Sequence, residues 1–502
     1  MFKTLINIFR VPELRNKVLF TLMMLAIFRI GHSVPIPGVD QWEFLSTEAK
    51  TVETAKIALR NAESAGDPVA IEAAKAEKER AEAAMAVSEN QTDNSAAGRI
   101  ATYVSIFSGG NLSHSTIFGL GVMPYISASI IFQLLATVVP SLEKLQKEGE
   151  AGRRKIQEWT RYSTVPIAAM QAYFWLGTMG DGKIQSTWDG PMFWVTGVVA
   201  LTAGCVFLMW IGEQIDEYGL GQGISLIIMA GIVCRMPAAL NMLWSNLDLT
   251  GQGGQGTYGP GTVIALSLSF IFVVATAILV TQAQRRIPIM QAKHTRGRRV
   301  YGGAKQFLPL KVNIGGVMPV IFAQSLMLFP GMLLGWLDAL ARSQGGTGWF
   351  SNTTIFLNQQ FGHGQFLYII TEVAMIFFFA FFWTTVQFKP KDIANNLRDY
   401  GSFIPGLRPG KRTADYLEKV MMRMTYVGAA FLCLIAVVPT IAFAYLGINY
   451  EIAAFLGGTG LLIVVSVLLD MVQRIETNLL TRNYAGFLGA GEGGKRIKGR
   501  QG

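Results

Sequence analysis

The 502-residue chain has few of the residues that enzymes commonly use for chemistry. It contains three cysteines and four histidines, and only 15% of its residues are Asp, Glu, Lys or Arg. Cys205, Cys234 and Cys433 have neither the spacing of a metal site nor that of a redox pair. The sequence has no HExxH motif and no Ser-plus-His arrangement suited to an intramembrane hydrolase. It therefore gives little support to an enzyme and predicts neither a metal nor another cofactor.

What the chain has instead is hydrophobic sequence, which makes up 51% of its residues and gives a mean hydropathy of +0.36. A composition this apolar excludes an ordinary soluble protein. An apolar helix needs about 20 residues to cross a bilayer. We therefore expect an all-α polytopic membrane protein with ten transmembrane helices, over 17–35, 122–140, 162–180, 192–212, 222–243, 261–283, 313–337, 366–388, 420–446 and 452–472.

The distribution of basic residues predicts the orientation of these helices. Eight Lys and Arg residues lie within 284–312 and seven within 389–419, whereas 244–260 has none. Loops rich in Lys and Arg stay in the cytoplasm. We therefore expect both termini to be cytoplasmic, with a basic tail over 474–502. On electrostatics alone, the segment 284–311 could bind RNA, anionic lipid or an acidic protein surface.

The segment 44–98 differs from the rest of the chain, because it is rich in Ala, Glu and Lys and has almost no large apolar residue. Two helix-forming runs flank a turn at Gly66 to Pro68, which predicts a helical hairpin. On the predicted topology this insertion is extracytoplasmic. A solvated spacer is the main interpretation, and a hairpin that binds a partner is the alternative.

An eight-residue sequence occurs twice. Gly121-Val-Met-Pro-Tyr-Ile-Ser-Ala128 and Gly316-Val-Met-Pro-Val-Ile-Phe-Ala323 are identical at six positions. Each copy falls in the second span of a group of five, and an odd number of spans makes the two groups inverted. The prediction is two inverted pseudo-symmetric halves, residues 1–243 and 244–473.

The first copy follows a stretch that reads as a broken helix. It begins as a Gly/Ser-rich half-helix, breaks at Gly119 and Gly121, and restarts at Pro124. Irregular backbone at membrane depth is tolerated where it is buried in protein or lines a cavity, so the break predicts a pathway for a polar passenger. Ion-coupled transporters usually carry mid-span carboxylates. Because Glu372 and Asp470 fall near predicted span ends, an ion-coupled secondary transporter with discontinuous helices is kept only as the alternative function.

Several long motifs cover nearly the whole chain, except for 44–98 and the last dozen residues. The main ones are FRIGHSVPIPG, FSGGNLSHSTIFGLGVMPYISASIIFQLL, KEGEAGRRKIQEWTRY, FLMWIGEQIDEYGLGQGISLIIMAGIV, GRRVYGGAKQFLPLKVNIGGVMPVIFA, FIPGLRPGKRTADYLEKVMMRMT and FLGGTGLLIVVSVLLD. Together and in this order, these motifs resemble the SecY family of protein-conducting channel subunits.

The resemblance implies a channel that passes unfolded secretory polypeptides across the bacterial plasma membrane. A half-helix plug over 105–118 would seal it, and this plug includes Ser108, Gly109, Gly110, Asn111, Leu112 and Ser113. An aliphatic pore ring would form the constriction, from Val122, Ile126, Ile224, Ile228, Ile321 and Ile463. Val122 stands where relatives often have Ile, so the ring would be slightly wider there.

The resemblance also implies a lateral gate and a set of partners. Transmembrane segments would leave for the lipid bilayer between spans 122–140 and 162–180 on one side and 313–337 and 366–388 on the other. Polar residues near this gate are Ser127, Gln133, Gln324 and Ser325. The implied partners are the membrane subunits SecE and SecG, the SecA motor ATPase, the ribosome with its RNA and proteins, signal peptides and nascent polypeptides. Residues implied to dock the ribosome or the motor are Arg285, Arg286, Arg298, Arg299 and Arg408.

Overall fold

The computed structural model describes ten stretches of the chain: residues 12–39, 116–178, 190–245, 259–291, 294–296, 299–301, 305–343, 349–361, 365–446 and 458–487. The predicted insertion over 44–98, the predicted plug residues from Ser108 to Ser113, and most of the basic tail lie outside them.

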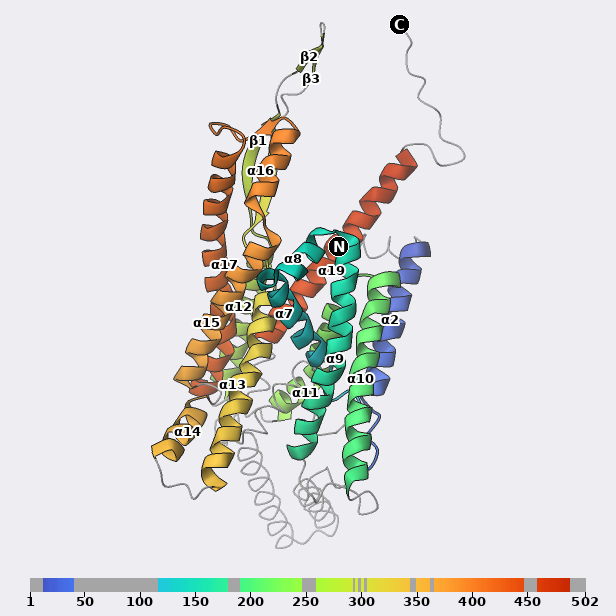
Figure 1. Cartoon of the computed structure of the whole chain (residues 1–502), viewed down its shortest axis with the longest axis vertical. Coiled ribbons are helices and arrows are strands. Elements are labelled where there is room, and N and C mark those ends of the chain that lie inside the picture. Colours follow the sequence, from blue (N-terminus) through green and yellow to red (C-terminus); the bar gives the residue numbers. More distant parts are fainter. Residues whose placement is uncertain are drawn as a thin grey trace.

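Each of the ten predicted spans coincides with a helix in Figure 1. These helices are α2 (Pro12–Gly31), α7 (Met123–Val138), α9 (Glu150–Thr178), α10 (Pro191–Tyr218), α11 (Gly223–Ser245), α12 (Pro260–Gln282), α13 (Met318–Ser343), α15 (Phe366–Gln387), α17 (Lys411–Leu446) and α19 (Thr459–Phe487). A further helix, α14 (Trp349–Gln360), lies between α13 and α15 in the chain.

The bundle has the surface of a membrane protein. Within the described residues, five helices are long and apolar enough to cross a bilayer, and α7 with the helix after it makes a sixth if that bent pair is one span. On α12 the apolar side chains of Ile264, Leu268, Ile271 and Leu279 are each more than 60% exposed. A contiguous apolar surface of this kind is stable in lipid but not in water. The protein is therefore an all-α polytopic membrane protein.

Several helices extend beyond the predicted spans. The segment 148–161, which lies between the predicted spans 122–140 and 162–180, forms the beginning of α9 from Glu150 onward. Likewise α10 continues to Tyr218 and α17 begins at Lys411. Hydropathy locates the part of a helix that lies in lipid, and it misses polar turns that continue the same helix into water.

The span predicted over 122–140 is shorter than expected. Helix α7 ends at Val138, and the chain bends by 103° into α8 (Pro140–Lys147). Val139 between them has an extended conformation, with φ −93° and ψ 115°. The residue before a proline is pushed out of the helical region, and Pro140 has no N–H to continue the helix. The proline therefore sets where α7 ends.

The basic segment after α12 contains a small sheet that was not predicted. Strand β1 (Gln284–Gln291) pairs antiparallel with β4 (Lys305–Lys311), and Ile287 is opposite Leu308. β5 (Ser402–Phe403) adds to the other edge of β1. Beyond them, β2 (His294–Arg296) pairs with β3 (Arg299–Tyr301). The alternation of buried Ile287 and Ile289 with exposed Arg286 and Pro288 is a strand signal that the emphasis on charge missed.

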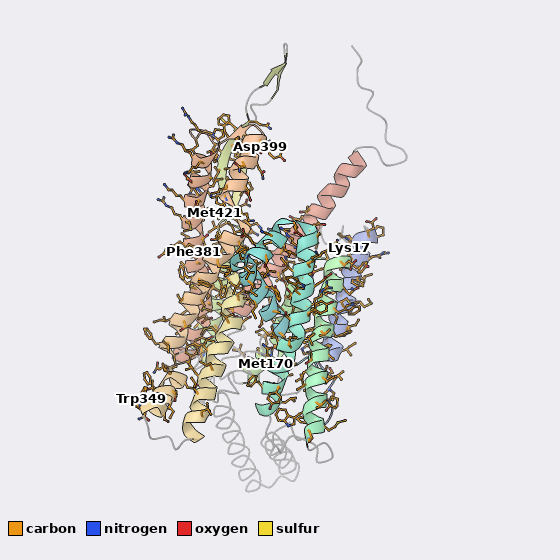
Figure 2. The ribbon with its side chains drawn as sticks, in the orientation of Figure 1. Lys17, Met170, Trp349, Phe381, Asp399 and Met421 are labelled. Atoms are coloured by element: carbon orange, nitrogen blue, oxygen red, sulfur yellow. The ribbon has the colours of Figure 1, made fainter. Side chains whose placement is uncertain are left out.

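This sheet packs on the end of α17 and on α16 (Pro390–Asp399). The shared apolar cluster consists of Ile287, Leu310, Phe388, Ile404, Leu417, Val420, Met421 and Met424. We call this end of the molecule the sheet end. Figure 2 shows Asp399 and Lys17 toward the sheet end, with Trp349 at the opposite end. The cluster fixes the basic strands rigidly onto the helix bundle.

Replacing the fully buried Leu417 by Ala should therefore loosen the sheet. A cavity of this size in a packed cluster costs about 2–4 kcal/mol. Thermal unfolding in detergent can be followed with a thiol-reactive dye, because Cys205 and Cys433 are buried until the chain unfolds. Met422→Ala, at an exposed position on the same helix, is the control and should leave the melting temperature nearly unchanged. Equal shifts for the two variants would contradict the packing described.

Candidate functional site

The two copies of the repeated sequence have the same local backbone. Gly121 and Gly316 have φ values of 58° and 59°, a conformation that glycine adopts without steric cost. A helix then begins at Met123 and at Met318, each with proline as its second residue. Proline is well tolerated in a first helical turn, where its missing N–H has no helical partner. Each repeat therefore starts a helix abruptly.

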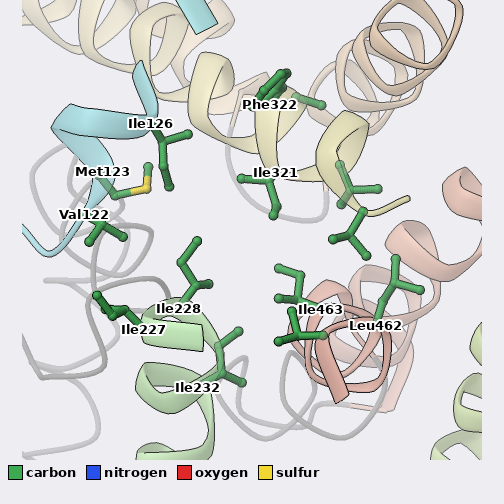
Figure 3. Close-up of a cluster of buried hydrophobic side chains, with 14 of the residues drawn as sticks. Val122, Met123, Ile126, Ile227, Ile228, Ile232, Ile321, Phe322, Leu462 and Ile463 are labelled. Carbon is green, nitrogen blue, oxygen red and sulfur yellow. The ribbon is translucent and has the colours of Figure 1, made fainter. Parts of the chain in front are cut away.

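The predicted ring residues come together inside the bundle. Val122, Ile126, Ile228, Ile321 and Ile463 are between 1% and 5% exposed and belong to one apolar cluster, against which Ile224 packs. They come from the start of α7 and from α11, α13 and α19. In Figure 3 the side chains of Ile126, Ile228, Ile321 and Ile463 point toward one another from different helices. Segments distant in the chain thus contribute to one aliphatic cluster.

Other members of this cluster were not predicted. Figure 3 places Met123, Ile227, Ile232 and Leu462 beside the ring residues. Ile232 follows Ile228 by one helical turn, so the helical period could have indicated it. Met123 and Leu462 are chain neighbours of ring residues. Periodicity alone cannot tell which of two adjacent buried residues faces the centre of a bundle.

A cavity of about 330 Å³ adjoins the ring. Its apolar wall includes Ile126, Ile224, Ile228 and Ile321, so it opens directly onto the constriction. Polar groups also line it, from Tyr125, Ser129, Gln133, Asp216, Gln222 and Ser225. A space with aliphatic and polar walls can accept an extended peptide, whose backbone is polar and whose side chains vary.

The acidic side chains near the cavity already have structural partners. Nε of Arg161 lies 2.5 Å from Oε1 of Glu213, an ion pair that joins α9 to α10. The carboxylate of Asp216 accepts a hydrogen bond of 2.7 Å from the backbone N–H of Gly223 at the start of α11. Within the described residues, no group of three or more His, Cys, Asp or Glu side chains is arranged to hold a metal ion.

Four polar residues were predicted at the lateral gate. Three of them form side-chain hydrogen bonds, each with a residue of the same half of the chain. Nε2 of Gln133 donates to Oγ of Ser129 at 3.1 Å, and Oγ of Ser325 donates to the carbonyl of Ile321 at 2.8 Å. The side chain of Gln324 donates a hydrogen bond to Thr459 of α19, not to a residue of α7. Ser127 is buried on α7. Helices α7 and α13 are nevertheless in contact, so the two repeats meet.

The end of the predicted plug is tightly held. Thr116 forms a β-bridge with Pro35, and the N–H of Ile117 donates to the carbonyl of Val34 at 3.0 Å. On its other side, a Cβ atom added to Gly204 of α10 would lie 2.2 Å from the carbonyl oxygen of Ile117. The close approach therefore depends on glycine. The last residues of the predicted plug are thus fixed to the bundle next to α7.

The predicted docking arginines lie at the sheet end. Arg285 and Arg286 are exposed on β1. Arg408 is exposed in the turn between β5 and α17, whose backbone bends at Gly406 (φ 83°) and Gly410 (φ 112°). The hydroxyl of Thr413 donates to the carbonyl of Arg408 at 2.9 Å, which holds the turn to α17.

The two remaining docking residues are only partly covered by the structure. The backbone of Arg299 belongs to β3, and Arg298 lies outside the described residues.

Comparison with known proteins identifies the family. The SecY family model matches residues 116–472, which include both repeats, the ring and the sheet. This chain belongs to the SecY family. Protein translocase subunit SecY of Thermotoga maritima is 37% identical over the full length of both chains. SecY of Escherichia coli K12 is 38% identical, over 95% of this chain and 94% of the relative.

Solved structures share the fold. One described as a protein-conducting channel has a TM-score of 0.53 and 17% identity, and covers 95% of both chains. Another, from work on how the SecY plug domain stabilises the closed channel, has a TM-score of 0.54 with the same identity and coverage. The SecY fold is thus present along almost the entire chain.

The close approach at Gly204 gives a prediction about the base of the plug. Gly204→Ala should force the segment around Ile117 away from α10, at a cost of about 1–3 kcal/mol for overpacking. Gly177→Ala is the matched control, because its added Cβ would meet only a Trp194 ring carbon at an ordinary 3.5 Å. Melting temperatures in detergent compare the two. A Gly204 variant as stable as the Gly177 variant would show that the segment is not tightly held.

Proposed function

We propose that this chain is the protein-conducting channel subunit of a bacterial Sec translocase, and that unfolded secretory polypeptides cross the membrane through its aliphatic ring. The observation that carries the proposal is that Ile126 and Ile321, one from each repeat, pack with Ile228 and Ile463 in one cluster. The chain that builds this cluster belongs to the SecY family. Curated relatives at 37–38% identity are named protein translocase subunit SecY.

The chemistry of the ring fits this role. Branched aliphatic side chains exclude water and ions by dewetting, so a closed ring blocks leakage. The same side chains make weak and non-directional contacts, so they can move aside for a passing chain of any sequence. A rigid polar filter would instead select one solute. The adjoining cavity gives an arriving polypeptide a place to begin.

The lateral gate is proposed between α7 and α13, with α9 and α15 as its flanking helices. Ser127, Gln133, Gln324 and Ser325 lie on the two facing helices. None of the three side-chain hydrogen bonds that these residues form joins α7 to α13. Opening this contact therefore breaks none of those bonds, and apolar segments of the passenger could leave sideways into lipid. The stretch 105–118 is proposed as the plug, with its last residues, from Thr116 to Phe118, as the fixed end about which the rest would move.

The sheet end is proposed as the cytoplasmic docking surface. Its exposed arginines and basic composition suit anionic partners, and the positive-inside rule places it in the cytoplasm of a plasma membrane protein with both termini inside. The proposed partners there are the ribosome and the SecA motor, and one solved structure with this fold is of a channel in a ribosome complex. SecE and SecG are the proposed membrane partners. The chain itself is proposed to have no catalytic activity.

The ring can be tested by contact with a passenger. In a variant with the three natural cysteines changed to Ser, Ile126→Cys and Ile321→Cys should each cross-link to a cysteine in a secretory chain stalled during export. Leu268→Cys, on the exposed face of α12, is the control and should give no adduct. The proposal fails if the passenger links to other positions of the protein and to neither ring position.

The docking surface can be tested by charge reversal. Arg408→Glu should reduce motor-driven export at least several-fold, because it places a carboxylate in a surface proposed to bind an anionic partner. The measurement is export into inverted membrane vesicles, with the amount of channel determined by immunoblot. Lys17→Glu makes the same charge change on α2 and should export normally. Normal export by the Arg408 variant would exclude the turn from docking.

A further inference from the structure

Glu372 is a buried carboxyl group to which the proposed function gives no role. It falls near a predicted span end, and the structure shows that its side chain faces the protein. The side chain is only 3% exposed and lies on α15 among the other helices of the C-terminal half. Cys433 of α17 is close to it, because Sγ of Cys433 lies 3.8 Å from the carbonyl of the adjacent Val373. A carboxyl group in such surroundings is costly unless it is hydrogen-bonded.

The carboxyl of Glu372 interacts with the side chain of Gln324 on α13. Nε2 of Gln324 donates to Oγ1 of Thr459, at 2.8 Å. Thr459 is the first residue of α19. One amide therefore connects three helices, α13, α15 and α19, and Gln324 itself is 8% exposed. We call Gln324, Thr459 and Glu372 the polar clamp.

The clamp lies next to the ring. Gln324 follows the ring residue Ile321 by three positions, and Thr459 precedes the ring residue Ile463 by four. Residues three or four apart share a helix face, about one turn from each other. The two helices that carry Ile321 and Ile463 are thus joined by the Gln324–Thr459 hydrogen bond, one turn from the constriction.

We propose that the polar clamp sets the separation of Ile321 and Ile463, so that Gln324, Thr459 and Glu372 are positioning residues for the closed ring. This inference rests on the proposed function, which makes the ring the constriction. Aliphatic contacts alone do not specify a spacing, because they are weak and non-directional. A partly buried hydrogen bond does specify it, because separating α13 from α19 would break the bond and leave polar groups unpaired in largely apolar surroundings. Glu372 lies beside the side chain of Gln324 on a third helix, α15.

The test measures the distance between α13 and α19 in the resting channel. In the cysteine-free background, Ile321→Cys and Ile463→Cys are introduced together, and membranes are treated with bifunctional thiol reagents of increasing span. The readout is the rate at which the shortest effective reagent joins the two positions. Glu372→Leu, Gln324→Leu and Thr459→Val should each lower this rate about three- to tenfold, the range expected for losing one interhelical hydrogen bond.

Conservative variants separate positioning from folding. Glu372→Gln and Thr459→Ser keep a hydrogen-bonding group and should restore the parental rate. Thr371→Val removes a hydroxyl that bonds only within α15, to the carbonyl of Leu367 at 2.7 Å, and should have no effect. Rates are normalised to folded protein. If Glu372→Leu fails to accumulate, the nearly isosteric pair Thr459→Val and Thr459→Ser decides the question.

Unchanged linking rates in the folded clamp variants would overturn the clamp, as would an equal fall for Thr371→Val. The reaction joins two positions of the same resting protein, so it does not depend on a passenger. If the stalled chain fails to link at the ring while the clamp variants behave as expected, only the proposed function is wrong. The reverse result leaves the function intact and removes the clamp.

Discussion

The structure depends on how the backbone is hydrogen-bonded where helices begin inside the bundle. At membrane depth no water is available to pair with free N–H and C=O groups. Before α7, the N–H groups of Gly119 and Gly121 donate to the carbonyls of Thr116 and Phe118, each at 2.8 Å. Before α13, Nδ2 of Asn313 donates to the carbonyl of Gly316 at 2.7 Å. These local bonds allow two helices to start within the protein, so a ring can form between them.

The sequence was sufficient to locate the helices, and the resemblance to the SecY family pointed to residues that pack in one aliphatic cluster. Apolar runs located ten helices, and the repeated Gly-Val-Met-Pro sequence located the two that begin abruptly. The prediction was wrong where a polar segment continues a helix, as from Glu150 in α9, and where charge concealed an alternating strand, as in β1. In both cases hydropathy and charge were considered without the helical or strand periodicity of the segment.

Side-chain partners were harder to predict than helices. Gln324 was assigned to the lateral gate because it follows the repeat, yet its amide bonds Thr459, 135 residues further along the chain. A hydrogen bond over such a separation leaves no periodic signal in one sequence. Glu372 was discounted as a mid-span carboxylate because it falls near a predicted span end, and its burial was not predicted. In a bundle, the face of the helix decides burial, and that face depends on neighbours that the sequence does not reveal.

Polar and aliphatic contacts have different distributions around the constriction, and their physical properties explain why. The ring is aliphatic, and contacts of this kind can be broken and remade with many geometries at small cost. The Gln324–Thr459 hydrogen bond connects two helices of the C-terminal half. The Arg161–Glu213 ion pair connects two helices of the N-terminal half. Directional bonds resist separation and aliphatic surfaces tolerate it. Directional bonds of this kind within each half, and aliphatic side chains where the repeats meet, fit the proposed lateral gate, in which the two halves would separate while each keeps its shape.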